Sequence, residues 1–81
     1  MSTAVTQEQV EAVVVESLET FGADPSLITP EATFEALDID SLDLAELSQI
    51  IHEHFGVELK GSDVAEVKTV KDAVELIASR L

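Results

Sequence analysis

The residues best placed to take part in chemistry lie around Ser41, which stands between Asp40 and Asp43 in an acidic segment. A serine hydroxyl acts as a nucleophile when a general base lies within hydrogen-bonding reach, and the candidate bases are His52 and His54. On a helix, the residues from Ser41 to His52 span about 16 Å, which is too far for proton transfer. The two aspartates would also oppose an oxyanion at the serine, so we do not expect this chain to be an enzyme.

The aspartates of this segment offer oxygen ligands, so calcium binding is a second chemistry to consider. Asp38, Asp40 and Asp43 provide some of the oxygens of a calcium-binding loop. The glycine and the closing glutamate that such a loop needs at fixed positions are missing. We therefore predict no dedicated metal site.

A third possibility is that Ser41 is modified by another protein. The N-terminus of a helix presents unpaired amides and partial positive charge, which would stabilise a phosphate on Ser41 by about 0.3–1 kcal/mol. The neighbouring carboxylates would attract an enzyme surface rich in Lys and Arg, mainly by raising the rate of encounter. The segment therefore favours an acceptor site that basic proteins recognise.

The charge of the whole chain supports basic protein partners. Its 81 residues include 17 acidic and 4 basic residues, which gives a net charge of -13. Residues 1–59 contain 13 of the acidic residues and no Lys or Arg, whereas residues 60–81 contain 4 residues of each sign. Such a chain repels nucleic acid and anionic membrane surfaces. With no Cys and no membrane-length apolar run, we expect a cytoplasmic protein. We also expect it to be a monomer.

The spacing of apolar residues predicts the elements that must position Ser41. It favours an all-α fold, a four-helix bundle with three longer helices, one short helix and a long loop between helices 1 and 2. We expect residues 1–81 to form a single domain.

The first predicted helix begins near Gln7, after a capping box formed by Thr6 and Gln9, and ends at Gly22. Its buried side is expected to contain Val10, Val13, Val14, Leu18 and Phe21. Two prolines exclude a continuous helix over residues 23–40, which should form a long loop. The loop is expected to be anchored by Ile28, Phe34 and Leu37.

The second predicted helix covers residues 41–55, with Asp40 as its N-cap and Gly56 at its end. Its buried stripe is expected to contain Leu44, Leu47, Ile51 and Phe55. A short helix is predicted over residues 62–66, and a last helix begins after a cap at Thr69. The inward residues of the last helix are predicted to be Val70, Ala73, Val74 and Ile77.

Several segments resemble one known family. The tripeptide Asp40-Ser41-Leu42 is similar to the Asp-Ser-Leu attachment motif of the acyl carrier proteins, and Asp43 and Glu46 continue it as in that family's second helix. Further similar segments extend the resemblance over nearly the whole chain, at residues 29–34, 54–57 and 69–73.

The resemblance implies a carrier function. A phosphopantetheinyl transferase would move 4'-phosphopantetheine from coenzyme A onto Ser41, and acyl chains would travel as thioesters on the thiol of this arm. The pathway would be fatty acid or polyketide biosynthesis. The resemblance also implies further partners with basic docking patches, namely ketosynthase, acyltransferase, reductase and dehydratase enzymes.

The acidic side of the second helix would meet these partners. The expected partner-binding residues are Asp40, Leu42, Asp43, Glu46 and Glu53. Leu42 is apolar but falls on the polar side, where it either makes a small hydrophobic contact at the docking centre or tucks under the loop. A second set of apolar residues either opens to shelter the acyl chain or is simply core: Leu47, Ile51, Leu59 and Val64.

One residue departs from the family pattern. Many fatty acid synthase carriers have glycine two residues before the aspartate of the motif, where this chain has Asp38. This departure leaves the pathway open, while Asp40 argues against a peptidyl carrier. We expect a stand-alone carrier of the type II kind. The alternative is an acidic helical adaptor that binds basic proteins and has no prosthetic group.

Overall fold

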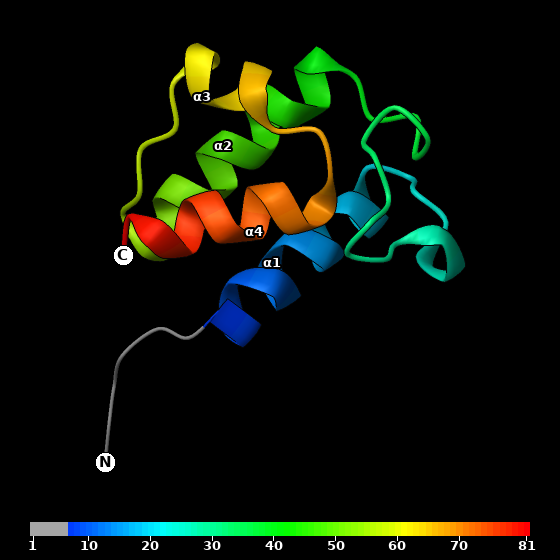
Figure 1. Ribbon diagram of the computed structural model, residues 1–81, viewed down its shortest axis with the longest axis horizontal. Coiled ribbons are helices and arrows are strands. Elements are labelled where there is room, and N and C mark those ends of the chain that lie inside the picture. Colours follow the sequence, from blue (N-terminus) through cyan, green and yellow to red (C-terminus); the bar gives the residue numbers. More distant parts are fainter. Residues whose placement is uncertain (1–6) are drawn as a thin grey trace.

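The computed structural model describes residues 7–81, and its order of elements matches the predicted bundle. A one-turn 3-10 helix, η1, lies in the connection between the first two α-helices (Figure 1). The elements are α1 (Gln7–Thr20), η1 (Pro25–Leu27), α2 (Ser41–Phe55), α3 (Gly61–Glu66) and α4 (Val70–Ser79). The prediction of three longer helices, one short helix and a long first connection is confirmed. The predicted cap at Thr6 lies outside the described residues.

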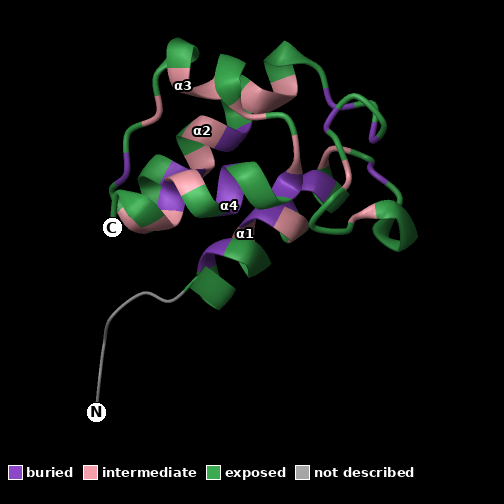
Figure 2. Ribbon diagram, viewed as in Figure 1, coloured by how far each residue is buried: buried purple, intermediate pink, exposed green. Residues whose placement is uncertain are grey.

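Helix α1 supplies the centre of the core and packs against both α4 and α2. Val10, Val14 and Leu18 are fully buried, while Val13 and Phe21 are partly buried against the same cluster. Burial of each fully enclosed aliphatic side chain stabilises the fold by about 1.5–3 kcal/mol. The spacing of these residues explains why one face of α1 is turned inward in Figure 2.

The end of α1 is a Schellman motif. Gly22 has a φ of 103°, its amide donates to Glu19 O, and the amide of Ala23 donates to Leu18 O, both at 3.0 Å. Ala23 and Leu18 are both buried, which is the hydrophobic contact that accompanies this motif. The predicted end of the helix at Gly22 is therefore confirmed.

The long connection between α1 and α2 is held by backbone hydrogen bonds to the start of α4. The amide of Phe34 donates to Lys68 O at 3.0 Å, and the amide of Val70 donates to Ala32 O at 3.0 Å. A third amide, that of Lys71, donates to Pro30 O at 2.9 Å. These bonds satisfy backbone groups that a buried loop would otherwise leave unpaired.

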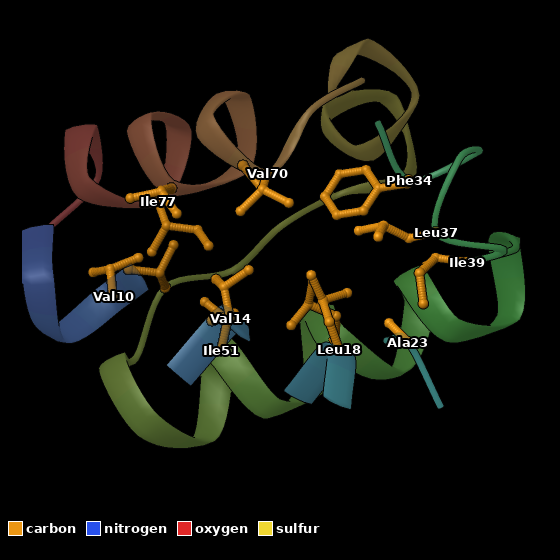
Figure 3. Packing of buried hydrophobic residues seen from close by; sticks show 14 residues of the cluster. Val10, Val14, Leu18, Ala23, Phe34, Leu37, Ile39, Ile51, Val70 and Ile77 are labelled. Carbon is orange, nitrogen blue, oxygen red and sulfur yellow. The ribbon is translucent and has the colours of Figure 1, made fainter. Parts of the chain in front are cut away.

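Apolar side chains also anchor this connection. Phe34 and Leu37 are buried as predicted, Ile28 is half-buried, and Ile39, which the sequence pattern did not single out, is buried too. Figure 3 shows Phe34, Leu37 and Ile39 together at one end of the core, with Val10 toward the other end. The connection is therefore part of the core and carries the chain to the first residue of α2.

Helices α2 and α4 contribute most of the remaining core. On α2, Leu47 and Ile51 are buried, while Leu44 and Phe55 of the predicted stripe are half-buried. Gly56 ends α2 with a φ of 71°, as predicted. On α4 the four residues predicted to face inward are all buried: Val70, Ala73, Val74 and Ile77. Within residues 7–81, none of the helices has both the length and the hydrophobicity to cross a membrane.

Helix α3 is held mainly by polar contacts. None of its six residues, all of them described, is buried (Figure 2). Arg80 forms a bidentate ion pair with Asp63, with N–O distances of 2.7 and 2.8 Å, and also donates to Glu58 O at 3.2 Å. The hydrogen bonds from Arg80 and from the Lys60 amide lower the pKa of Asp63 to about 2. The ion pair therefore joins the end of α4 to the start of α3.

Replacing Asp63 by Asn is expected to lower the melting temperature at neutral pH, because it removes the ion pair with Arg80. The pKa of Asp63 is about 2 in the fold, below the ordinary value of 3.8, so the ion pair stabilises the fold above about pH 4. This contribution is lost as the pH falls toward about 2. Thermal unfolding followed by circular dichroism at decreasing pH should show the variant and the parent converging.

Glu66→Gln is the matched control, because it neutralises a carboxylate of the same helix for which residues 7–81 provide no ion-pair partner. It should change the melting temperature little at any pH. A deficit of Asp63→Asn that persists at its full size under strongly acidic conditions would contradict the role assigned to the ion pair.

Candidate functional site

The start of α2 is shaped by two aspartates that cap each other. The amide of Asp43 donates to Asp40 Oδ1 at 3.0 Å, and the amide of Asp40 donates to Asp43 Oδ2 at 3.4 Å. This is a capping box in which Asp40 is the N-cap and Ser41 is the first helical residue. The prediction of Asp40 as the cap is confirmed. The reciprocal role of Asp43 was missed, although the same three-residue spacing, between Thr6 and Gln9, was used to predict the start of the first helix.

The capping box leaves the hydroxyl of Ser41 uncommitted. Asp40 is the N-cap and accepts from the amide of Asp43, so Ser41 Oγ does not serve as the cap, and within residues 7–81 it makes no hydrogen bond. The Ser41 residue is exposed. The site therefore presents a free hydroxyl at the positively polarised end of a 15-residue helix.

Neither of the two candidate histidine bases lies beside this hydroxyl. Helix α2 is continuous from Ser41 to Phe55, so His52 lies about 16 Å further along the axis. Both His52 and His54 are exposed. In the described part of the chain, no group of three His, Asp or Glu side chains is arranged to hold a metal ion.

Three of the five predicted partner-binding residues lie on one side of α2. At 100° per residue, Leu42, Glu46 and Glu53 fall within about 40° of one another on the helix surface. All three are exposed, whereas Asp43 is half-buried. Leu42 is 79% exposed, so the alternative in which it tucks under the loop is wrong. The arrangement is an apolar side chain within an acidic surface, next to Ser41.

A surface groove begins at Ser41 and runs between α2 and α3. Leu59 and Val64, two of the residues considered for sheltering an acyl chain, line this groove, whereas Ile51 is fully buried in the core. The α2 side of the groove consists of Ser41, Leu44, Ala45 and Ser48. The opposite side consists of Leu59, Lys60, Gly61, Val64, Ala65 and Val67.

A small hollow, partly open to solvent, continues the groove toward the core. Leu47 and Val64 line it, and its volume of about 20 Å³ has room for about one water molecule. An acyl chain therefore cannot enter unless α3 moves away from α2. The absence of buried residues on α3 makes such a movement less costly than the opening of a core helix.

The turn that precedes α2 contains the residue that departs from the family pattern. Asp38 has a φ of 60°, its amide donates to Glu35 O at 3.1 Å, and the amide of Ile39 donates to Phe34 O at 2.9 Å. This is the same Schellman arrangement that ends α1. Asp adopts the left-handed conformation more readily than most residues, and glycine adopts it without strain. Because both glycine and Asp accept this conformation, it accounts for the Asp of this chain at a position where glycine would also fit.

Comparisons with known proteins agree with this geometry. The model of the phosphopantetheine attachment site family matches residues 8–77. An acyl carrier protein of Thermosynechococcus vestitus is 39% identical over 75 residues, which are 91% of this chain and 89% of that protein. The meromycolate extension acyl carrier protein of Mycobacterium leprae is 42% identical over 76 residues, which are 91% of this chain and 66% of that protein.

Solved structures give the same result. The actinorhodin acyl carrier protein of Streptomyces coelicolor in its 3,7-dioxo-octyl form has a TM-score of 0.73 at 30% identity, covering 99% of this chain and 94% of that chain. Its holo form has a TM-score of 0.70 at 30% identity, with 100% and 95% covered.

These matches place the chain among the proteins to which phosphopantetheine is attached. Within that class, it belongs to the acyl carrier protein family. It is a carrier and not an enzyme, and its cofactor is a covalently attached 4'-phosphopantetheine. The exposed, uncommitted hydroxyl of Ser41 fits such an attachment.

Three substitutions at Asp38 test the conformation of the turn. Asp38→Ala is expected to lower the free energy of unfolding by about 1 kcal/mol, because alanine is strained at positive φ. Asp38→Gly should be at least as stable as the parent, since glycine accepts this φ freely. Urea unfolding followed by circular dichroism measures both changes.

Asp38→Asn is the control for charge, because Asn tolerates the same conformation without the carboxylate. We expect it to be close to the parent in stability. If Ala and Asn have the same effect, the loss comes from the missing charge and the conformational explanation fails.

Proposed function

We propose that Ser41 is the attachment point and that the chain carries acyl groups through fatty acid or polyketide biosynthesis. The observation that carries this proposal is the exposed Ser41 hydroxyl, freed by the Asp40 cap at the start of α2. In the transfer, Ser41 Oγ forms a new P–O bond to the pantetheine phosphate of coenzyme A. The pyrophosphate bond breaks, adenosine 3',5'-bisphosphate leaves, and a base of the transferase takes the hydroxyl proton.

The chain's own residues would hold and present the attached group. The arm supplies a thiol that carries acyl chains as thioesters, which a protein without Cys cannot supply itself. The N-terminus of α2 favours the negative phosphodiester next to Ser41. Asp40 Oδ1 and Asp43 Oδ2 accept the backbone amides of the capping box, and the other oxygen of each carboxylate is left for a partner.

The acidic side of α2 is proposed to dock the partner enzymes. Leu42 would make the apolar contact, and the carboxylates of Asp40, Asp43, Glu46 and Glu53 would face Lys and Arg side chains. The proposed partners are a phosphopantetheinyl transferase and the ketosynthase, acyltransferase, reductase and dehydratase enzymes. Support comes from the charge distribution, since residues 1–59 contain 13 acidic residues and no Lys or Arg.

The relatives support both branches of the proposed pathway. One is named for meromycolate extension and another for actinorhodin, so the comparisons include more than one kind of acyl carrier. We further propose that residues 1–81 form a single carrier domain, because the family match spans residues 8–77 and the described core is one cluster.

Incubation with coenzyme A and a broad-specificity phosphopantetheinyl transferase tests the attachment. The chain is expected to gain the mass of one phosphopantetheine, and peptide mapping should locate it on Ser41. Ser41→Ala should gain nothing, while Ser62→Ala, which removes another exposed serine, should be modified like the parent. An acidic adaptor would gain no mass, and modification of the Ser41→Ala variant would refute the assignment.

Two matched substitutions test the docking side of α2. Glu46→Gln is expected to lower kcat/KM of the transferase by about threefold to tenfold at low salt, with a smaller effect at high salt. Glu75→Gln makes the same change at an exposed position of α4 and should leave kcat/KM unchanged. Equal effects of the two variants would show that net charge, rather than this side of α2, governs recognition.

A further inference from the structure

The α2 side of the groove is a single stripe that connects Ser41 to a second serine. Ser41, Leu44, Ala45 and Ser48 are spaced as i, i+3, i+4 and i+7, so they lie on the same side of the helix. Ser48 is therefore about 10 Å from Ser41 along the axis of α2. A group attached at Ser41 that lies in the groove passes over Ser48.

Ser48 lies where the groove meets the small hollow that continues it toward the core. It lines both spaces, and the other described residues around the hollow are apolar. These apolar residues include Leu44, Leu59 and Val64, which also line the groove. A chain that moves from the groove into the core thus meets one hydroxyl in apolar surroundings.

The hydroxyl of Ser48 can be redirected at low cost. Its Oγ donates to Leu44 O at 3.0 Å in the structure. In a continuous helix Leu44 O also accepts the amide hydrogen of Ser48, so this carbonyl stays paired when the hydroxyl turns toward the groove. The hydroxyl oxygen can in addition accept a hydrogen bond without giving up its own.

We propose that Ser48 makes the groove selective for acyl chains that carry an oxygen near the thioester, such as 3-oxo and 3-hydroxy chains, over saturated chains. This inference rests on the proposed function, because it requires an acyl arm on Ser41. A keto oxygen accepts from the Ser48 hydroxyl, and a chain hydroxyl either donates to it or accepts from it. A saturated chain does neither, and the hydroxyl then keeps its hydrogen bond to Leu44 O.

The size of the selectivity follows from the net free energy of one hydrogen bond. For a single neutral hydrogen bond, this free energy corresponds to a preference of about threefold to tenfold for the oxygen-bearing chain over the saturated chain. The preference should appear as protection of the thioester, because an acyl chain held in the groove keeps its thioester away from nucleophiles in solution.

Ser48→Thr and Ser48→Val form the matched pair for the test. Their side chains have the same shape, but Thr keeps the hydroxyl and Val replaces it with a methyl group. Each protein is loaded at Ser41 with octanoyl or 3-oxo-octanoyl phosphopantetheine from the corresponding acyl-coenzyme A. The rate of thioester cleavage by hydroxylamine is then measured for each chain.

The Val variant is expected to lose its 3-oxo-octanoyl group about threefold to tenfold faster than the Thr variant. The octanoyl group of the Val variant should be cleaved no faster than that of the Thr variant. Because the two proteins are compared with the same acyl chain, the intrinsic reactivity of the thioester cancels. Ser48→Ala, a second hydroxyl-free variant, should behave like Val, and melting temperatures verify that all variants fold.

Equal Val-to-Thr ratios for the two chains would overturn the inference. NMR gives a second test, in which the shift changes of the α2 and α3 amides are compared between the Val and Thr variants. If attaching the unacylated phosphopantetheine already produces the whole difference, and the acyl chain adds none, residue 48 contacts the arm itself and the inference is overturned. Failure to load Ser41 is a different result, visible by intact mass, and it would refute the proposed function together with this inference.

Discussion

The reciprocal hydrogen bonding of Asp40 and Asp43 is the interaction on which the site depends. It starts α2 at Ser41, with Asp40 and not the serine at the N-cap position, and it pairs the amides of Asp40 and Asp43. A serine at the N-cap position would have its oxygen occupied by an amide of the first turn. One residue further on, the hydroxyl is exposed at the positive end of the helix. The cap therefore both builds the helix and frees the oxygen for modification.

The long first connection determines where this cap lies in the fold. Backbone hydrogen bonds at Phe34, Ala32 and Pro30 join it to the start of α4, so a core helix holds the segment before the site in place. The turn that follows buries Phe34 and Ile39 and reverses direction at Asp38. The positive φ of Asp38 also bears on the pathway. Since Asp accepts this conformation, its presence in place of glycine reflects the turn and does not itself distinguish fatty acid from polyketide carriers.

Local patterns in the sequence were enough to predict the helices and their ends. Helical spacing, the cap at Asp40 and the stops at Gly22 and Gly56 depend on residues within a few positions of one another, and each is found in the structure. The ion pair of Arg80 with Asp63 could not be predicted in this way, because it joins residues 17 positions apart. The groove also depends on how α3 lies against α2. The position of Ser48 in the groove therefore could not be predicted from the sequence, because it depends on the packing of the two helices.

The weak anchoring of α3 is consistent with the work of a carrier. An acyl chain must be sheltered between enzymes and released at each of them, so one wall of its groove has to move while the rest of the core stays intact. Helices α1 and α4 have buried stripes, whereas none of the six residues of α3 is buried. Helix α3 is held by the polar contacts of Arg80. Such contacts can be broken and re-formed in water at little cost, since exposed ion pairs contribute only modestly to stability. The groove therefore has a fixed wall on α2, which carries Ser41 and Ser48, and a movable wall on α3.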